Sequence, residues 1–180
     1  MAPRFSIVIP PRNRPDYVRF ALESVRAQTF ENFEVIVSDN HTGQACKAVF
    51  DKIADERFRY ATPATPLAMH DNWEYATSLA AGEFVTVLID KTALLPSALA
   101  TLNRLANEIP ADLYSFRSDA YYLSAEARGD VGPGRFVRSL PKVPPFEFDP
   151  MQELARRFSF DVRLGTEREK YYWGKICFGI

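Results

Sequence analysis

Two short apolar segments that end abruptly at polar residues constrain the fold of this chain more than any other feature. The first, residues 5–9, is followed by the polar segment 10–14, and the second, residues 33–38, is followed by residues 39–41. Apolar runs of this length are typical of strands buried on both faces of a parallel sheet. In open α/β sheets, ligands bind just beyond the carboxyl ends of such strands. We therefore expect segments 10–14 and 39–41 to lie on one ligand-binding edge.

Helical and strand-like segments alternate along the first two thirds of the chain. Apolar residues at helical spacing, with Pro15 suited to a first helical turn, predict a helix over residues 14–29. The same reasoning predicts further helices at 44–54, 68–80 and from Pro96 onward, and further strands at 58–61, 84–89, 113–116 and 120–123. Met69 and Trp73 of the third helix are expected in the core. This alternation predicts an α/β fold, a three-layer α/β/α sandwich with a mostly parallel central sheet.

The composition changes after residue 123. Glycines and prolines mark a loop-rich region, and a helix is predicted at 150–158. We therefore divide the chain into an α/β core, residues 1–123, and a loop-rich segment of the same domain, residues 124–180. The last ten residues are aromatic and apolar, which we interpret as a chain cut short within a longer protein, with a docked C-terminal strand as the alternative. Exposed aromatic residues at such an edge would favour a homo-oligomer.

Charge and cysteine content narrow the class of protein. The 180 residues include 22 Lys and Arg against 23 Asp and Glu, so no overall positive field attracts nucleic acid. The apolar segments are too short to span a bilayer, so no transmembrane segment is expected. Cys46 and Cys177 lie far apart without metal-ligand spacing, which favours two reduced thiols and a cytoplasmic protein.

The segment after the first strand carries residues suited to an anionic ligand. Pro10 and Pro11 stiffen the backbone as it leaves the strand and donate no backbone hydrogen bond. Arg12, Asn13 and Arg14 then present side-chain donors where a helix N-terminus also favours anions. A nucleotide and its diphosphate fit this chemistry. An ordinary polar turn with two solvated arginines is the alternative.

Asp39 directly follows the second buried strand. A carboxylate there can accept a hydrogen bond from a nucleobase imide or a ribose hydroxyl. The alternative is a local role, as an Asx turn or as the N-cap of the next helix. Since Asn40 and Thr42 are also suited to that local role, we favour Asp39 as a ligand contact. His41 is within reach of the same cleft, although a single loop histidine more often has no such function.

Three blocks of sequence carry a resemblance to a known family. They are Ile-Pro-Pro-Arg-Asn-Arg (9–14) with Ser-Val-Arg-Ala-Gln-Thr-Phe (24–30), Val-Ser-Asp-Asn (37–40), and residues 66–85, where a helix carrying Asn72 leads to Ala-Ala-Gly-Glu-Phe-Val. Together they resemble the opening of family 2 glycosyltransferases of the GT-A fold, over residues 4–105. The resemblance implies a Rossmann-like half that binds a nucleoside-diphosphate sugar, with Asp39 on the base and Asn72 facing the nucleotide.

The same resemblance implies an enzyme that transfers a sugar to an acceptor hydroxyl, usually with inversion at the anomeric carbon. Whether the acceptor is a sugar, a lipid or a protein stays open. In the family an acid beyond the middle of the domain acts as the general base. The available acids, none in a recognisable motif, are Asp119, Glu147, Asp149, Asp161, Glu167 and Glu169. Because residues 174–179 resemble the segment just before that base, we expect the base to be absent from this chain.

Residues 87–96 correspond to the segment where the family usually carries an acidic cluster, the DxD-type motif, shortly before a proline. Its carboxylates hold a divalent cation, Mg²⁺ or Mn²⁺, that bridges the two phosphates. Asp90 falls in this cluster and is the implied metal ligand, but Lys91 and Thr92 stand where acids are usual. Three interpretations stay open: Lys91 supplies the positive charge in place of the metal, the site has degenerated, or Asp90 and Lys91 form a solvated turn pair.

The altered acidic cluster and the expected absence of the base leave a second hypothesis, a sugar-nucleotide-binding domain without catalytic activity. A dinucleotide-dependent oxidoreductase requires a Gly-x-Gly-x-x-Gly turn after the first strand. Residues 10–15 contain no glycine, so we set that hypothesis aside.

Overall fold

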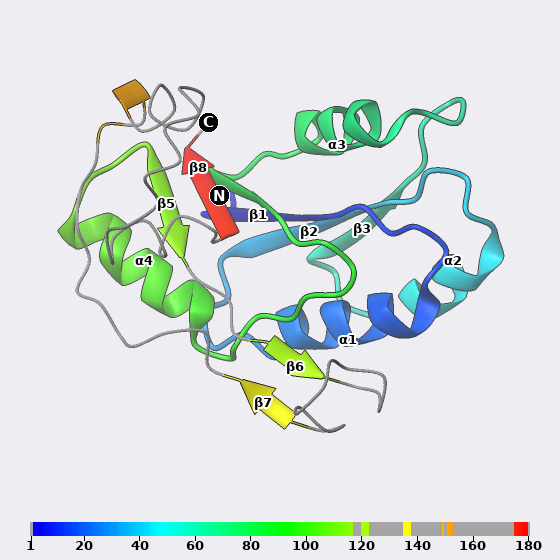
Figure 1. Cartoon of the computed structure of the whole chain (residues 1–180), viewed down its shortest axis with the longest axis horizontal. Coiled ribbons are helices and arrows are strands. Elements are labelled where there is room, and N and C mark those ends of the chain that lie inside the picture. The colour runs from blue at the N-terminus through cyan, green and yellow to red at the C-terminus, as the bar shows by residue number, and fades with distance from the viewer. Residues whose placement is uncertain are drawn as a thin grey trace, which may run out of the picture. The chain divides into compact units, whose positions relative to one another are not determined.

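A six-stranded sheet carries the fold of the structure, a computed structural model of the chain (Figure 1). In spatial order its strands are β3 (Phe58–Ala61), β2 (Phe33–Ser38), β1 (Phe5–Ile9), β4 (Phe84–Val87), β8 (Lys175–Gly179) and β5 (Leu113–Phe116). β1 pairs in parallel with β2 and with β4, and β2 pairs in parallel with β3. The predicted α/β fold with a parallel central sheet is therefore confirmed, and β4 lies inside the sheet rather than at its edge.

The described part of the chain falls into two units. The structure describes residues 2–116, 120–122, 135–137, 149, 151–152 and 175–179. One unit comprises Met1–Tyr114 with Ile176–Ile180, and the other comprises Ser115–Lys175. None of the helices in these described ranges is long and apolar enough to cross a membrane.

The three central strands are in register, which sets where their ends lie. All five residues of β1, four apolar residues and Ser6, are buried, as a mostly apolar run of this length predicts. Phe5 pairs with both Phe33 and Phe84, and at the other end Ile9 pairs with Val37. Because the three strands start level and run in the same direction, the loops that follow them leave the sheet at one edge. We call this the carboxyl edge.

Helices cover both faces of the sheet (Figure 1). On one face α1 (Pro15–Arg26) packs against α2 (Gln44–Phe50), and on the other α3 (Met69–Ser78) packs against β1, β2 and β4. α4 (Ala98–Glu108) follows β4 along the chain. Each of these four helices is predicted by the sequence; the first three are shorter than predicted, and α4 begins at Ala98 rather than at Pro96. Pro15 occupies the start of α1, as expected for a residue whose missing N–H costs nothing there.

Gln28 joins the end of α1 to the start of α4. Its side-chain amide donates to the carbonyl oxygens of Ser24 (3.0 Å) and Leu95 (2.8 Å), and its oxygen accepts from the Leu99 N–H (3.0 Å). Gln28 is only 7% exposed, so these bonds satisfy a buried amide that would otherwise be costly. They fix the position of α4 relative to α1.

A second set of polar contacts holds the strands together near their amino ends. Oε1 of Glu34 in β2 accepts hydrogen bonds from Ser6 Oγ (2.6 Å) and Ala81 N (2.7 Å). Oε2 of Glu34 pairs with the Arg59 guanidinium at 2.8 Å. A Cβ added to Gly82 would lie 2.7 Å from Ser6 Oγ and 2.8 Å from Ser6 N, so this close approach of the chain to β1 requires glycine.

The strand pairing of the later part of the chain differs from the expected parallel pattern. Residues 175–179 form a docked strand, the alternative considered for the final segment: β8 pairs antiparallel with β4, with Gly179 opposite Phe84. Residues 120–123 were expected to continue the parallel pattern. Instead β6 (Ala120–Tyr122) pairs antiparallel with β7 (Arg135–Val137), in a two-stranded sheet that includes part of the expected loop region. An apolar run indicates a strand but does not indicate which strand it pairs with.

Met69 is a further correction, because it is 62% exposed rather than in the core. Asn72, one turn later in α3, already contacts Ser38 at the last residue of β2. Met69 therefore lies beyond the carboxyl end of β2. Trp73 is half-buried. The predicted helix at 150–158 falls largely outside the described residues.

Candidate functional site

The loops that follow β1, β2 and β4 lie at the carboxyl edge. The parallel pairing extends one residue beyond β4, where Leu88 N donates to Val8 O (2.8 Å). Asp39 follows β2 directly, and Asp90 stands three residues after β4. Neighbouring strands lie about 4.8 Å apart, so loops after β2 and β4 are separated by roughly 10 Å, with the loop after β1 between them. Polar groups from three separate segments of sequence therefore border one region.

The loop after β1 is tied to Asp90. Pro10 and Pro11 are both buried and have no N–H, so Arg12 offers the first backbone donor after the strand. That N–H lies 3.5 Å from Asp90 Oδ2, and the Arg14 guanidinium lies 3.4 Å from Asp90 Oδ1. Asn13, between the two arginines, adopts a positive φ of 54° that turns the chain into α1. The predicted residues of this loop and Asp90 thus form one cluster.

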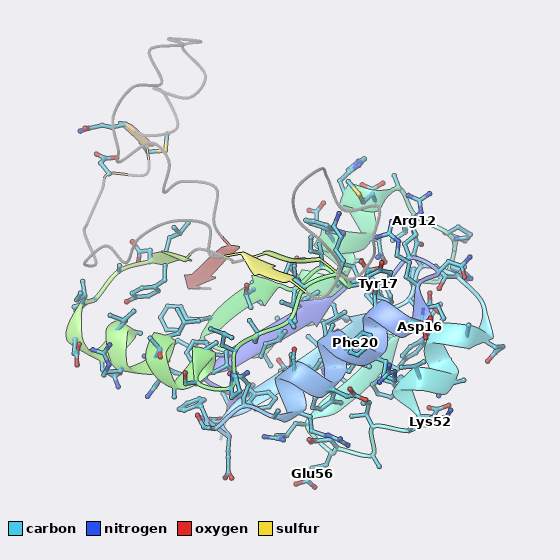
Figure 2. The ribbon with its side chains drawn as sticks, turned by 60° about the horizontal axis from the view of Figure 1, so that its bottom comes forward. Arg12, Asp16, Tyr17, Phe20, Lys52 and Glu56 are labelled. Atoms are coloured by element: carbon cyan, nitrogen blue, oxygen red, sulfur yellow. The ribbon has the colours of Figure 1, made fainter. Side chains whose placement is uncertain are left out.

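Exposure differs sharply within this cluster. The Asp90 side chain is only 7% exposed, whereas the Arg14 side chain is 49% exposed. Arg12 is exposed as well, and Figure 2 shows it at the N-terminal end of α1, with Asp16, Tyr17 and Phe20 following along the helix. Lys91 is exposed. The interpretation of Asp90 and Lys91 as a solvated turn pair is therefore wrong, because Asp90 is buried and forms its ion pair with Arg14.

Asp39 is 4% exposed and is held by residues from two sides. Its Oδ1 accepts hydrogen bonds from the backbone N–H (3.0 Å) and the hydroxyl of Thr42. Its Oδ2 accepts a hydrogen bond from the Tyr60 hydroxyl in β3. Burial, together with the bond to Asp39, raises the pKa of Tyr60 far above its usual range, so the phenol stays protonated and donates. Asp39 therefore makes the local turn considered as its alternative role, and its contact with a ligand stays a prediction.

Side chains from the loop after β2 hold a neighbouring loop in place. The Asn40 amide donates to Leu67 O (2.6 Å) and accepts from Leu67 N (2.8 Å). His41 Nε2 contacts Pro63 O at 2.8 Å, so its ring is used in this loop contact. These bonds fix residues 62–67, the connection from β3 to α3, beside Asp39.

Asn72 of α3 is buried, and its hydrogen bonds run to β2. Its Oδ1 accepts from Ser38 Oγ at 2.9 Å, and its Nδ2 lies 3.5 Å from Ser38 O. Ser38 precedes Asp39, so Asn72 fixes the strand end from which the acid leaves. A direct contact of Asn72 with a nucleotide stays a prediction.

The described side chains of this edge do not form a complete ligand set for a divalent cation. Within the described residues, no three His, Cys, Asp or Glu side chains come together as a metal site. Asp90 is the one acid of its segment, both of its oxygens face donors from the loop after β1, and the next residue carries an ammonium group. Mg²⁺ usually keeps several waters and binds one or two protein carboxylates together with substrate phosphates, so Asp90 alone would hold such an ion only together with the diphosphate and water. The Thr92 hydroxyl is used in a turn with Ile89 O (2.6 Å).

Asp149 is the one described residue among the acids considered as a general base. Its Oδ1 accepts hydrogen bonds from the N–H groups of Met151 (2.8 Å) and Gln152 (3.1 Å). It therefore caps the start of a helical turn. The other five candidate acids lie outside the described residues.

Tyr60 and Thr42 were not identified as site residues from the sequence. Tyr60 stands opposite Val37 in the register of β3 with β2, next to the strand end that leads to Asp39. Its place near the end of an expected strand is a weak signal that becomes useful only once the register is known. The ion pair of Arg14 with Asp90 joins residues 76 positions apart, and no local pattern indicates it.

Comparison with known proteins identifies the family. The model of glycosyl transferase family 2 matches residues 6–150. The chain belongs to glycosyl transferase family 2. Its resemblance to that family, drawn above from three blocks of sequence, is thereby confirmed.

The chain is also similar to a curated relative and to solved structures, which show the likeness in fold. A GalNAc(5)-diNAcBac-PP-undecaprenol beta-1,3-glucosyltransferase of Campylobacter jejuni is 34% identical over 109 residues, which cover 59% of this chain and 35% of that protein. TarS of S. aureus, solved in complex with UDP, has a TM-score of 0.59 at 22% identity, covering 70% of this chain and 37% of that one. A mannosyltransferase of Pyrobaculum calidifontis, solved with GDP-Man and Mn²⁺, has a TM-score of 0.56 at 16% identity, covering 64% and 36%. The chain thus spans little more than a third of each relative's length.

Proposed function

We propose that this chain is the donor-binding part of a glycosyltransferase that takes a sugar from a nucleoside-diphosphate sugar and transfers it to an acceptor hydroxyl with inversion. The observation that supports this most directly is the meeting of three polar loops at the carboxyl edge. It brings Asp39 to one side of the loop after β1 and Asp90 to the other. Open α/β sheets bind ligands at such an edge.

The residues of the edge suit different parts of the donor. A carboxylate has about four lone-pair positions, and Asp39 uses three of them on Thr42 and Tyr60, so about one remains for an N–H of the base or a ribose hydroxyl. The exposed Arg12 and Arg14 at the start of α1 suit the diphosphate, since guanidinium groups and a helix N-terminus both favour anions.

Transfer with inversion makes limited demands on these residues. The acceptor oxygen forms a bond to the anomeric carbon on the face opposite the diphosphate. The bond from that carbon to the phosphate oxygen breaks, and its electron pair leaves with the nucleoside diphosphate. The acceptor proton passes to a base that we do not assign among the described residues. Holding the growing negative charge of the diphosphate is the contribution that the arginines of this edge can make.

The acceptor and compartment are further parts of the proposal. The Campylobacter relative is named for a lipid-linked sugar acceptor, so a sugar carried on a lipid is the first acceptor class to test. Protein and free-sugar acceptors are the alternatives. A cytoplasmic location stays a prediction from the sequence.

Calorimetric titration of the 180-residue chain with UDP, GDP and dTDP tests the proposal. We expect at least one of the three to bind with a dissociation constant below about 1 mM. Absence of heat with all three, for a chain that melts cooperatively, would contradict donor binding at this edge.

A binding domain without catalytic activity is the second candidate. Lys91 and Thr92 in place of acids favour it, because the family's usual means of holding the diphosphate is altered. A turnover assay separates the two candidates: binding together with release of nucleoside diphosphate in the presence of acceptor supports an enzyme, and binding without release supports the second candidate.

A further inference from the structure

We propose that the donor site of this chain operates without a divalent cation, because Arg14 pairs with Asp90, the one acid of the segment in which an acidic cluster would hold the metal. This inference rests on the proposed binding of a nucleoside-diphosphate sugar. It differs from the sequence hypothesis in which Lys91 alone replaces the metal. Here Arg14, from the loop after β1, supplies the positive charge. The sequence predicted Arg14 as a site residue but not its ion pair with Asp90.

The geometry around Asp90 is the first support. Both of its oxygens face donors from one loop, with Arg12 N at 3.5 Å and the Arg14 guanidinium at 3.4 Å. A carboxylate that is 7% exposed is costly unless it is paired, so this arrangement stabilises the charged acid. A metal ion bound to Asp90 would compete with Arg14 and the Arg12 N–H for the carboxylate, and it would stand next to the guanidinium charge.

The exposure of Arg14 is the second support. Half of its side chain surface is exposed, so guanidinium nitrogens beyond the one near Asp90 remain accessible to a ligand. A guanidinium carries five N–H donors in a planar fork that matches phosphate oxygens. Asp90 thus acts as a positioning residue for Arg14, and Arg14 is the residue that contacts the diphosphate.

The balance of charge is the third support. Among residues 10–14 and 90–92, three side chains are positive, Arg12, Arg14 and Lys91, and only Asp90 is negative. An acidic cluster at 90–92 would reverse this balance and would require a divalent cation before a diphosphate could approach. Here the diphosphate meets a region that is already positive, whereas a divalent cation would be repelled by Lys91 and Arg12.

The test is calorimetric titration of UDP and of GDP into the 180-residue chain, once in EDTA and once in Mn²⁺. For the nucleotide that binds, we expect affinities in the two conditions to agree within about twofold. Arg14→Gln is expected to weaken binding in EDTA by at least about tenfold, because it removes a hydrogen bond between charged groups. Arg19→Gln is the matched control: Arg19 lies on α1, which Arg14 directly precedes, is exposed and pairs with Glu23 at 3.3 Å, and its replacement is expected to leave affinity unchanged.

A gain-of-metal variant provides an independent readout. Lys91→Asp combined with Thr92→Asp rebuilds an acidic cluster beside Asp90, so Mn²⁺ alone should then bind, as detected by loss of the free Mn²⁺ signal in electron paramagnetic resonance. The unaltered chain should leave that signal unchanged. Thermal unfolding of each variant establishes that it is folded.

Three outcomes of these titrations test whether the nucleotide binds without a divalent cation. Equal affinity in EDTA and Mn²⁺, lost on Arg14→Gln, supports the inference. An affinity at least about tenfold higher with Mn²⁺ in the unaltered chain, or full affinity in folded Arg14→Gln, overturns it while donor binding stands. No binding of any nucleotide in either condition contradicts the proposed function and this inference with it.

Discussion

The hydroxyl of Tyr60 donates a hydrogen bond to Oδ2 of Asp39, so the acid that follows β2 is held by the neighbouring strand β3. Thr42 occupies the other carboxylate oxygen through its N–H and its hydroxyl. The orientation of the carboxylate is therefore fixed before any ligand arrives. A preorganised acceptor loses less conformational freedom on binding than a mobile one, which favours affinity.

Tyr60→Phe is expected to lower the free energy of unfolding by about 1–2 kcal/mol, because it removes a hydrogen bond to a charged group that is buried. The pKa of Tyr60 is raised in the folded state, so this contribution is full below the ordinary tyrosine pKa of about 10 and is lost only above it. Urea denaturation at several values between pH 6 and pH 9 should thus show a constant difference. Tyr17→Phe, at an exposed position of α1, is the control and should change stability by less than about 0.5 kcal/mol.

Asp39→Asn is expected to weaken nucleoside diphosphate binding by about 1.5–3 kcal/mol, since it replaces the charged acceptor proposed to contact the base or ribose. The asparagine keeps the shape of the side chain and one acceptor oxygen, so it disturbs the turn with Thr42 less than alanine would. Asp51→Asn is the matched control, because Asp51 is exposed and pairs only with Lys47 across one turn among the ion pairs described. Equal affinities of Asp39→Asn and the unaltered chain in calorimetry would remove Asp39 from the donor site.

The strands that build the site are predictable from the sequence, because their signal is local. Strands buried on both faces are rich in apolar residues, and the mostly apolar runs at β1 and β2 end where the structure ends these strands. Their position at one edge then follows from parallel pairing and the level register of the strands. The sequence could therefore predict that Pro10, Asp39 and Asp90 border one region at this edge.

The contacts within the site could not be predicted from the sequence, because they depend on strand register and on distant parts of the chain. Tyr60 reaches Asp39 only because β3 pairs with β2 in one particular register. β8 pairs with β4, although about ninety residues separate them, and its apolar run gives no sign of its partner or direction. The position of Lys91 in the motif predicts that it supplies the positive charge, whereas the structure has Arg14 as the cation that pairs with Asp90.

Glu34→Gln is expected to change how stability depends on pH. Burial alone would raise the pKa of Glu34, but hydrogen bonds from Ser6 and Ala81 and the charge of Arg59 together hold it below its usual value. A carboxyl whose pKa is lowered in the folded state contributes stability above its unfolded pKa, about 4.3, and loses it as the pH falls through the folded value. The unaltered chain should therefore exceed Glu34→Gln in stability at pH 7, and this advantage should shrink between about pH 5 and about pH 3. A constant advantage across that range in urea denaturation would show that the Glu34 contacts do not depend on its charge.

Gly82→Ala is expected to lower the free energy of unfolding by about 1–3 kcal/mol through overpacking. The added Cβ would lie 2.7 Å from Ser6 Oγ, 2.8 Å from Ser6 N and 2.9 Å from the carbonyl carbon of Phe5, and two of these three atoms belong to the backbone of β1. Removing the hydroxyl should therefore not relieve the crowding, so Ser6→Ala combined with Gly82→Ala should be no more stable than Gly82→Ala. Thermal unfolding of the two single variants and the double variant measures this. Recovery of stability in the double variant would show that the hydroxyl, rather than the backbone of β1, is what requires glycine at this position.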